Sequence, residues 1–263
     1  VDTLKDYARA IARQRSQLGR IQSKFPGSVT TADGAELLVM ANVGSREDTE
    51  RAIKNGADGI GLFRTGEIYL ALQTLPTEEF LYKTLRHALT PAGNRPCTIR
   101  LPDIGSDKHL PFLNFTQEVD PALGLRGIRL LKKYPNMLEA QLRVYLRLSK
   151  EMDVRILVPM VTDSGEMKWV RDQLSRVAAE IEIPAPPLGA MVETPAAVLC
   201  IEEILTWCDF INIGTNDLTQ YTLAAGRENL TVEAYYNDSH PAVLRLLKMI
   251  IEAKPQIPVG ICG

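Results

Sequence analysis

The sequence predicts an α/β protein of the TIM type, a (β/α)8 barrel. Short apolar segments alternate with longer amphipathic ones, which is the pattern of a parallel sheet covered by helices. The segments Val154–Met160 and Phe210–Gly214 are apolar on both faces, as strands buried in a parallel sheet should be. Several apolar segments also end in a charged residue, and the carboxyl ends of barrel strands share one rim.

The first residues predict a helix that precedes the barrel. Apolar side chains from Leu4 to Ile21 fall on one stripe among Lys, Arg and Gln, and Pro26–Ser28 breaks the pattern. We interpret residues 1–28 as a linker helix from a missing N-terminal domain, although a helix packed on its own domain is an equal alternative. Residues 29–263 are then the barrel domain.

Seven strands and six helices follow in alternation. The expected strands are Glu36–Asn42, Gly59–Phe63, Cys97–Leu101, Val154–Met160, Leu188–Glu193, Phe210–Gly214 and Val259–Cys262. The expected helices are Ser45–Asn55, Thr77–Leu89, Asn136–Met152, Ser164–Ile181, Pro195–Trp207 and His240–Ala253. Ser45 and Ser164 suit N-caps, and Pro195 and Pro241 suit first helical turns. Because a closed barrel needs an eighth strand, the sequence predicts a barrel truncated at its C-terminal end.

Composition excludes several classes of protein. The chain has 263 residues and a net charge of −2, which disfavours nucleic acid as a partner because nucleic-acid binding favours a basic surface. Its four cysteines lack CxxC spacing and no signal peptide precedes them, which favours reduced thiols and a cytoplasmic location. Apolar runs are too short to cross a bilayer, so membrane insertion is not expected.

Two carboxylates form the strongest candidate site. Glu193 ends one apolar strand, and Asp217 lies just after the next. Either residue alone is more simply interpreted as a cap of the following helix. Two carboxylates on adjacent strand ends, however, suit Mg²⁺, which takes oxygen ligands and keeps substrate oxygens and water in its other positions.

Basic side chains on the same rim are candidates for binding an anion. Arginine matches phosphate and carboxylate groups with two parallel hydrogen bonds, although a lone loop arginine is usually a solvated surface charge. Arg100 is harder to dismiss, because it closes an apolar strand and precedes Asp103–Lys108, a segment able to fold over a phosphate. Asp103 and Asp107 are either turn residues or arginine partners. The candidates, which together predict a site for a phosphorylated carboxylic acid, are Arg64, Arg100, Arg126, Arg227 and Lys108.

Cys262 ends the seventh predicted strand. A cysteine on a strand is usually a small core residue. Its place on the predicted rim makes it a candidate proton donor or nucleophile. The other cysteines, Cys97, Cys200 and Cys208, lack such a place and are interpreted as structural.

Segments along nearly the whole chain resemble the C-terminal, phosphoenolpyruvate-binding barrel of enzyme I of the bacterial phosphoenolpyruvate:sugar phosphotransferase system, which serves sugar transport. The dikinase and synthase that use the same substrate share several of these motifs, but Asp103–Lys108 and the helical lead-in are more similar to enzyme I. The segments are Gly56–Thr65 (GADGIGLFRT), Arg100 with Asp103–Lys108 (DIGSDK), Pro121–Arg129 (PALGLRGIR), Val158–Val161 (VPMV), Met191–Ala197 (MVETPAA), Ile213–Leu223 (IGTNDLTQYTL), His240–Arg245 (HPAVLR) and Gly260–Gly263 (GICG).

The resemblance implies a role for each candidate residue. Glu193 and Asp217 would bind Mg²⁺, and Cys262 would exchange a proton with the methylene carbon of the enolate or pyruvate. The phosphate and carboxylate of phosphoenolpyruvate would be held by a basic and polar set, with Arg126 supporting it: Arg64, Arg100, Lys108, Asn216 and Arg227. The implied enzyme is a phosphoenolpyruvate–protein phosphotransferase. It would be a homodimer whose phosphoryl acceptor is a histidine on an N-terminal domain, which passes the group to a small phosphocarrier protein.

Two departures from the family pattern lie beside this site. Gly66-Glu67 stands where the family usually has Glu-Phe, and Gly226 stands where it usually has Asp. Neither removes a predicted ligand, but both leave open an altered activity. Two alternatives therefore remain: the barrel of a pyruvate phosphate dikinase or phosphoenolpyruvate synthase, and a non-catalytic module for sensing or dimerisation.

Overall fold

The computed structural model describes residues 29–106, 108, 110–113, 118–253 and 255–263. The chain divides into two compact units, Val1–Val39 and Met40–Gly263. The predicted linker helix at residues 1–28 lies outside the described residues. In the first unit, β1 (Val29–Thr30) and β2 (Glu36–Leu37) form an antiparallel hairpin, in which Val29 pairs with Leu37.

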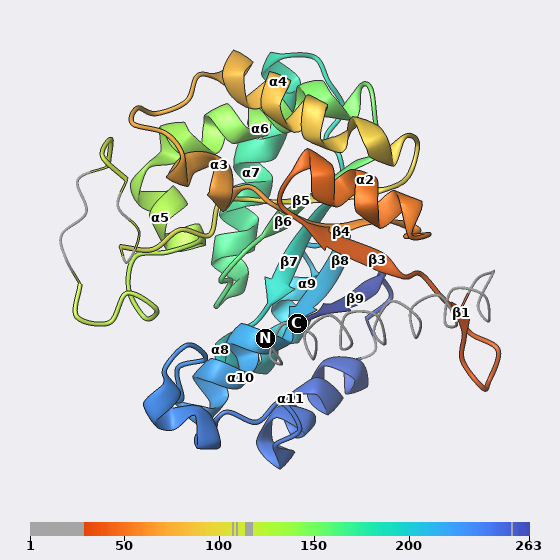
Figure 1. Ribbon diagram of the computed structural model, residues 1–263, viewed down its shortest axis with the longest axis vertical. Coiled ribbons are helices and arrows are strands. Elements are labelled where there is room, and N and C mark those ends of the chain that lie inside the picture. The colour runs from red at the N-terminus through yellow and green to blue at the C-terminus, as the bar shows by residue number, and fades with distance from the viewer. Residues whose placement is uncertain (1–28, 107, 109, 114–117, 254) are drawn as a thin grey trace, which may run out of the picture. The chain divides into compact units, whose positions relative to one another are not determined.

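The second unit contains a seven-stranded, all-parallel sheet. Its strands follow one another in sequence order, each paired with the next along the chain. They curve into a nearly closed barrel with helices around it, which confirms the predicted α/β barrel class (Figure 1). The strands are β3 (Met40–Val43), β4 (Gly59–Arg64), β5 (Cys97–Arg100), β6 (Val154–Val158), β7 (Leu188–Val192), β8 (Phe210–Gly214) and β9 (Val259–Cys262).

Helices connect successive strands on the outside of the sheet, as parallel pairing requires. Ser45 caps the first of them by accepting a hydrogen bond from Asp48 N at 3.1 Å. The helices are α2 (Arg46–Lys54), α3 (Gly66–Leu70), α4 (Glu78–Leu89), α5 (Ile128–Lys133), α6 (Pro135–Ser149), α7 (Ser164–Glu180), α8 (Pro195–Leu199), α9 (Ile201–Leu205), α10 (Thr215–Leu223) and α11 (Pro241–Glu252), with 3-10 turns η1 (Thr90–Ala92) and η2 (Leu230–Tyr235).

The inner strands β4 to β8 bury both of their faces, whereas β3 and β9 at the edges of the sheet are partly exposed, and successive side chains enter different layers. In β6, Ile156 and Val158 join the large core between sheet and helices, whereas Leu157 joins a small cluster inside the barrel. That inner cluster comes from four strands, with Cys262 packed against it: Leu62, Leu157, Met191 and Phe210. The amide of Asn212 on β8 also donates to Gly61 O on β4 at 3.3 Å, which spans the barrel interior. The interior is therefore filled beneath the rim.

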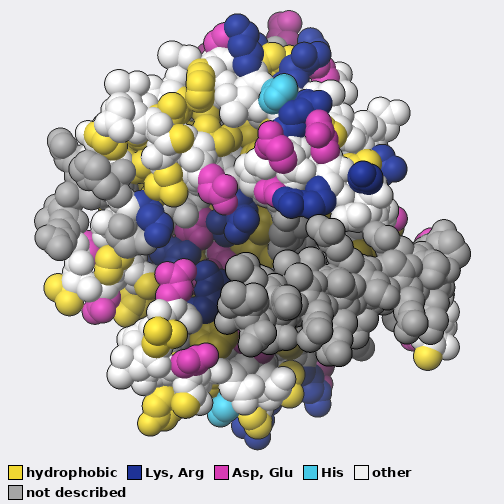
Figure 2. All heavy atoms as spheres, viewed as in Figure 1, with side chains coloured by type: hydrophobic (Ala, Val, Ile, Leu, Met, Phe, Trp, Pro, Cys, Tyr) yellow, Lys and Arg dark blue, Asp and Glu magenta, His cyan; other side chains and the backbone are white. Residues whose placement is uncertain are grey.

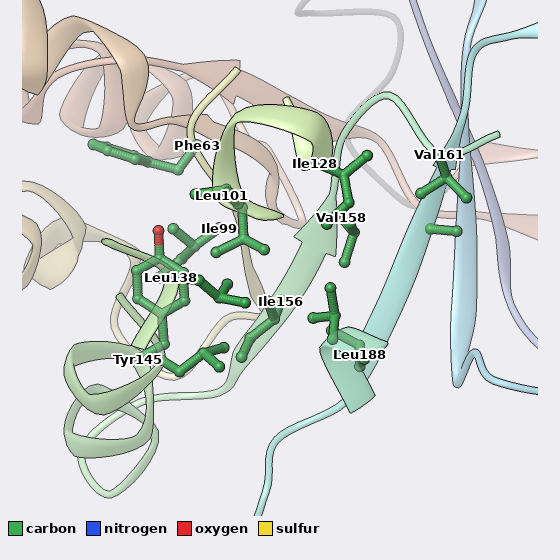
Figure 3. Close-up of a cluster of buried hydrophobic side chains, with 14 of the residues drawn as sticks. Phe63, Ile99, Leu101, Ile128, Leu138, Tyr145, Ile156, Val158, Val161 and Leu188 are labelled. Carbon is green, nitrogen blue, oxygen red and sulfur yellow. The ribbon is translucent and has the colours of Figure 1, made fainter. Parts of the chain in front are cut away.

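The outer core holds the helices against the sheet. Figure 3 shows Leu138 and Tyr145 of α6 beside Ile99 and Ile156 of β5 and β6. Tyr145 is fully buried, and this burial raises the pKa of its hydroxyl well above the ordinary value. Such packing fixes the strands, and hence the residues at their ends, in one arrangement.

Several predicted elements need correction. The single strand expected over Glu36–Asn42 is wrong, because β2 ends at Leu37 and β3 begins at Met40 in the other unit. The helix expected over Pro195–Trp207 is interrupted at Cys200, which separates α8 from α9.

The cap of α7 is also one residue earlier than expected. Asp163, rather than Ser164, accepts a hydrogen bond from Glu166 N at 3.0 Å. The Glu166 carboxylate in turn accepts one from Asp163 N, which completes a capping box. Helices α3, α5 and α10 were not predicted, since each is short or begins within a motif rich in glycine. Pro195 and Pro241 do occupy first helical positions, as predicted.

The barrel interior generates a stability prediction. A Cβ on Gly189 of β7 would lie 2.6 Å from the ring of Phe210, which is 5% exposed. We expect Gly189→Ala to lower the free energy of unfolding by about 1–3 kcal/mol through overpacking. In urea unfolding, Phe210→Leu should cost less in the Gly189→Ala background than alone, because it relieves the clash.

Gly66→Ala is the matched control for this pair. Its Cβ would meet nothing nearer than 3.6 Å, so the change should stay within about 0.5 kcal/mol. Strictly additive effects of Gly189→Ala and Phe210→Leu would contradict the packing described.

Candidate functional site

The carboxyl ends of the strands open into one large pocket of about 1050 Å³. Lys, Arg, Asp and Glu side chains gather near the middle of the face in Figure 2. Every site residue predicted from the sequence lines this pocket: Arg64, Arg100, Lys108, Arg126, Glu193, Asn216, Asp217, Arg227 and Cys262. The structure therefore brings together residues that are up to about two hundred positions apart in sequence, as a shared barrel rim dictates.

Asp103 is the centre of the charged network. Its side chain is only 4% exposed, and Arg126 binds it with two hydrogen bonds, Nε to Oδ1 at 3.0 Å and Nη2 to Oδ2 at 2.7 Å. Arg100 Nη1 lies 3.3 Å from Asp103 Oδ2. Burial raises the pKa of Asp103, but Arg100 and Arg126 outweigh burial and lower that pKa below its ordinary value. Asp103 is thus an ionised partner of two arginines.

Arg126 lies between Asp103 and Asp217 on the wall of the pocket. Besides Asp103, its Nη1 donates to Tyr221 Oη at 2.9 Å and lies 3.5 Å from Asp217 Oδ1. Burial lowers the pKa of Arg126, but the bonds and charge of Asp103 outweigh this effect and raise it. Arg126 therefore remains a fixed positive charge that links Asp103 of the β5 loop to Asp217 of α10.

Glu193 is buried at the end of β7, where it is 1% exposed. Its Oε1 accepts a hydrogen bond from Met160 N at 2.7 Å. A Cβ on Gly214 would lie 2.8 Å from Glu193 Oε2, so the glycine leaves the space that this carboxylate occupies. Burial, followed by the charge of Asp103, raises the pKa of Glu193 to about 8. A cation bound beside Glu193 would favour the ionised carboxylate and so offset this shift.

Glu193 and Asp217 fit a magnesium ion because they offer carboxylate oxygens that interact with each other. Asp217 lies in the first turn of α10, and its charge contributes to the raised pKa of Glu193, so the two carboxylates interact. Among the described residues no group of three or more His, Cys, Asp or Glu could hold a metal. Two carboxylates suffice for Mg²⁺ when substrate oxygens and water complete its coordination. No transition-metal type of site with several nitrogen or sulfur ligands is formed in that part of the chain.

The other basic residues lie at different depths of the pocket. Arg100 is 14% exposed, and its Nε is buried without a hydrogen-bond partner among the described residues. Arg64 is about half exposed and lies 3.5 Å from Glu67. Arg227 is 47% exposed, and its backbone N donates to Gln220 Oε1 at 2.9 Å. The mostly buried Arg100 and the more exposed Arg64 and Arg227 can together bind a ligand that has two anionic groups.

Cys262 completes the floor of the pocket. Its Sγ lies 3.5 Å from Ile213 O, and the side chain packs against the inner apolar cluster. Burial, followed by the charge of Glu193, raises the pKa of the Cys262 thiol to about 11. At neutral pH the group is therefore a protonated thiol, which suits a proton donor better than a nucleophile.

The structure adds residues that the sequence did not single out. Met160 has a left-handed backbone with φ 58°, and this turn points its N–H at Glu193. Such strain in a residue other than glycine is typical of functional sites. Tyr221 contacts Arg126 from one helical turn beyond Asp217. The spacing of four residues could have indicated Tyr221, had α10 been predicted. Met160 lies in the VPMV segment, but no glycine there indicates a left-handed turn.

The fold and this rim define an α/β-barrel protein with a polar binding site at the carboxyl ends of its strands. A solved structure similar in fold is the HpcH/Hpal aldolase/citrate lyase family protein from Burkholderia cenocepacia J2315, with a TM-score of 0.53 and 12% identity over 85% of this chain and 77% of that one. Residues 20–263 match the model of the PEP-utilising enzyme, PEP-binding domain. The chain belongs to this family, where PEP is phosphoenolpyruvate.

Curated relatives agree with this assignment. The chain is 34% identical to multiphosphoryl transfer protein 2 of Escherichia coli (strain K12), over 97% of this chain and 32% of that protein. It is 35% identical to phosphoenolpyruvate-protein phosphotransferase of Priestia megaterium, over 100% of this chain and 47% of that protein. The chain thus spans less than half the length of these relatives. The resemblance to the enzyme I barrel is confirmed at the level of the family.

The structure also bears on the membrane. Within the described residues, no helix combines the length and the apolar character that crossing a bilayer would need.

The buried ion pairs generate a second stability prediction. Asp103→Asn removes the carboxylate that Arg100 and Arg126 share, so it should lower the free energy of unfolding by about 3 kcal/mol. Asp153→Asn is the matched control, because Asp153 lies 3.6 Å from Arg155 in a pair that is 46% and 32% exposed. That variant should lose less than about 1 kcal/mol in urea unfolding. Equal losses in the two variants would contradict a structural role for Asp103.

The raised pKa of Glu193 predicts a pH dependence of stability. In metal-free buffer the folded protein keeps a proton on Glu193 that the unfolded chain releases, so this group's contribution is lost as pH rises towards about 8. We expect the free energy of unfolding of Glu193→Gln to decline less than that of the wild type between about pH 5 and 8. Glu202→Gln, which alters an exposed carboxylate on α9, should follow the wild type. Parallel curves for Glu193→Gln and the wild type would show that Glu193 has an ordinary pKa.

Proposed function

We propose that this chain is the phosphoenolpyruvate-binding catalytic domain of a phosphoenolpyruvate–protein phosphotransferase of the enzyme I type. The observation that carries the proposal is the pocket in which two carboxylates, Glu193 and Asp217, face several basic side chains. The family match and the names of the curated relatives support the substrate and the reaction. The phosphoryl group would pass to a histidine on another domain, and pyruvate would be released.

The basic residues bind the two anionic ends of phosphoenolpyruvate. Arg100 lines the pocket and is held 3.3 Å from Asp103 Oδ2, so the accessible part of its guanidinium is placed to bind a ligand oxygen. Arg64, Lys108 and Arg227 supply further positive charge on the pocket wall, and Asn216 supplies an amide. Arg126 is committed to Asp103 and supports the set from behind. Phosphoryl transfer depends mainly on such positioning and charge neutralisation.

Mg²⁺ bound by Glu193 and Asp217 would supply Lewis-acid stabilisation of the charge on the phosphate and on the enolate. The chain's own contribution is to hold the two carboxylates ready. Met160 N fixes Glu193, and the helical first turn fixes Asp217. Both carboxylates line the pocket, where ligand oxygens and water would complete the coordination of the ion.

Cys262 would provide the proton that completes the reaction. Transfer of the phosphoryl group leaves the enolate of pyruvate, whose methylene carbon must gain a proton to become a methyl group. A thiol whose pKa is raised to about 11 is protonated at neutral pH and lies on the pocket floor. The thiolate formed by this step recovers a proton from solvent before the next turnover.

The two departures from the family pattern are compatible with this function. Glu67, one residue beyond the usual acidic position, lies 3.5 Å from Arg64, so a carboxylate still pairs with that arginine. A Cβ on Gly44 would lie 2.9 Å from Glu67 Oε2, so Gly44 leaves room for Glu67. A Cβ on Gly226 would find only an ordinary contact at 3.5 Å, and Gly226 leaves Arg227 on the pocket wall. A decayed, purely sensory site is therefore disfavoured.

The partners follow from the same assignment. The relatives named as multiphosphoryl transfer proteins support a phosphohistidine domain as phosphoryl acceptor, ahead of the dikinase and synthase alternatives. A small phosphocarrier and a homodimeric state complete the proposal.

Calorimetric titration of phosphoenolpyruvate with and without Mg²⁺ tests the function. We expect binding that strengthens with Mg²⁺ in the wild type, and a loss of at least about tenfold in Mg²⁺-dependent affinity for Glu193→Ala and for Asp217→Ala. Glu202→Ala, on the exposed face of α9, is the control and should bind as the wild type does. Binding that is absent, or that neither carboxylate variant alters, would refute the proposed site.

A further inference from the structure

The hydroxyl of Tyr221 sits at the junction of three parts of the site. Tyr221 is on α10, four residues after Asp217, so both side chains project from one face of that helix. Its Oη donates to Ala122 O at 2.6 Å and accepts from Arg126 Nη1 at 2.9 Å. Met160 Sδ lies 3.9 Å from the same oxygen. The hydroxyl has one proton, which it donates in the hydrogen bond to Ala122 O, so its oxygen acts as an acceptor for Arg126.

Arg126 must divide its donors between three partners. Asp103 takes Nε and Nη2 in a two-fold bond. The remaining terminal nitrogen, Nη1, has Tyr221 at 2.9 Å and Asp217 at 3.5 Å. The shorter distance is that of an ordinary hydrogen bond, whereas the longer one lies beyond the usual range. Tyr221 is therefore the partner that satisfies Nη1, and Asp217 is held only loosely.

We propose that Tyr221 is a positioning residue that keeps Arg126 from closing onto Asp217, so that this carboxylate stays available to a divalent cation. The proposal rests on the proposed function, because it assigns Asp217 to the metal. An arginine and Mg²⁺ compete for the same carboxylate oxygens, and a bidentate guanidinium is a strong competitor. The Tyr221 hydroxyl is a neutral acceptor that satisfies Nη1 at 2.9 Å, so it lowers the free energy that Nη1 would gain by moving closer to Asp217.

The backbone around Tyr221 is built to hold this arrangement. Ala122 and Arg126 belong to one loop, which ends at Gly127 with φ 55°. A Cβ on Gly127 would lie 2.7 Å from Met160 Cβ, so only glycine lets the loop approach the Met160 turn this closely. Met160 N in turn binds Glu193. Tyr221 thus anchors the loop of Arg126 against the same turn that holds the other carboxylate.

A purely structural role makes a different prediction. If Tyr221 only anchors the loop, its loss should weaken phosphoenolpyruvate binding equally with and without Mg²⁺, because the loop carries Arg126. If Tyr221 protects Asp217, its loss should lower the affinity for Mg²⁺ and leave the metal-free affinity for phosphoenolpyruvate unchanged. The two readings are therefore separable by binding alone.

Tyr221→Phe tests the proposal, since it removes the hydroxyl and keeps the ring. Mg²⁺ is titrated calorimetrically into the protein with saturating phosphoenolpyruvate, and phosphoenolpyruvate is titrated separately in metal-free buffer. We expect the Kd for Mg²⁺ to rise about fivefold, which corresponds to the net free energy of one hydrogen bond. The metal-free Kd for phosphoenolpyruvate should stay within about twofold of the wild-type value. A crystal structure of the variant should show Arg126 Nη1 closer to Asp217 than 3.5 Å.

Two controls sharpen the result. Tyr235→Phe alters a tyrosine of η2 that is 72% exposed and should leave both affinities unchanged. In an Arg126→Gln background, where the competing charge is gone, Tyr221→Phe should cause no further loss of Mg²⁺ affinity. This cycle keeps the proposal testable if Tyr221→Phe alone also destabilises the fold.

Three results would overturn the proposal. Protection of Asp217 would be excluded if Tyr221→Phe left the Kd for Mg²⁺ unchanged, or if it weakened phosphoenolpyruvate binding equally with and without the metal. It would also be excluded if Tyr221→Phe lowered the Mg²⁺ affinity as much in the Arg126→Gln background as in the wild type. A wild-type protein that binds phosphoenolpyruvate with no effect of Mg²⁺ would refute the metal assignment itself, and the proposal with it. The wild-type titration thus separates failure of the proposed function from failure of the role of Tyr221.

Discussion

The site depends on one buried carboxylate, that of Asp103. Two guanidinium groups converge on it, and the loss of hydration that burial imposes on all three charges is offset by their mutual attraction and hydrogen bonds. Through Arg126 the same carboxylate is connected to Tyr221 and Asp217. The network fixes where positive charge lies in the pocket, and it leaves the carboxyl groups of Glu193 and Asp217 for a cation.

The apolar packing of the barrel stabilises the fold, whereas the rim carries the residues of the site. Beneath the rim, apolar side chains such as Leu157 and Phe210 fill the interior, and the outer core holds the helices in place. This packing provides the stability that pays for charges buried at the strand ends. The strained turn at Met160 is tolerated because its residue is 2% exposed and held by neighbours, and its backbone N–H fixes Glu193.

Much of this architecture could be predicted from the sequence, and the reasons are local. Fully apolar strands such as Phe210–Gly214 and proline at the first turns of α8 and α11 identify a parallel α/β protein without knowledge of distant contacts. Charged residues near strand ends, such as Arg64, Arg100 and Glu193, could be placed at one pocket from the sequence, because a barrel places strand ends on one rim, whereas lining residues such as Gln220 and Asn229 were not predicted. Partnerships within the rim could not be predicted. Whether Asp103 pairs with arginine or caps a turn depends on how loops fold back, and Tyr221 gains its role only when α10 places it beside Arg126.

Above all, we propose that Glu193 and Asp217 share a divalent cation together with the substrate. The most direct measurement is an anomalous difference map from crystals of the protein with Mn²⁺ and phosphoenolpyruvate. We expect a single strong peak bound by a carboxylate oxygen of each residue and by the ligand, with Arg126 still paired to Asp103. A peak elsewhere on the protein, or one that contacts only one of the two carboxylates, would contradict it.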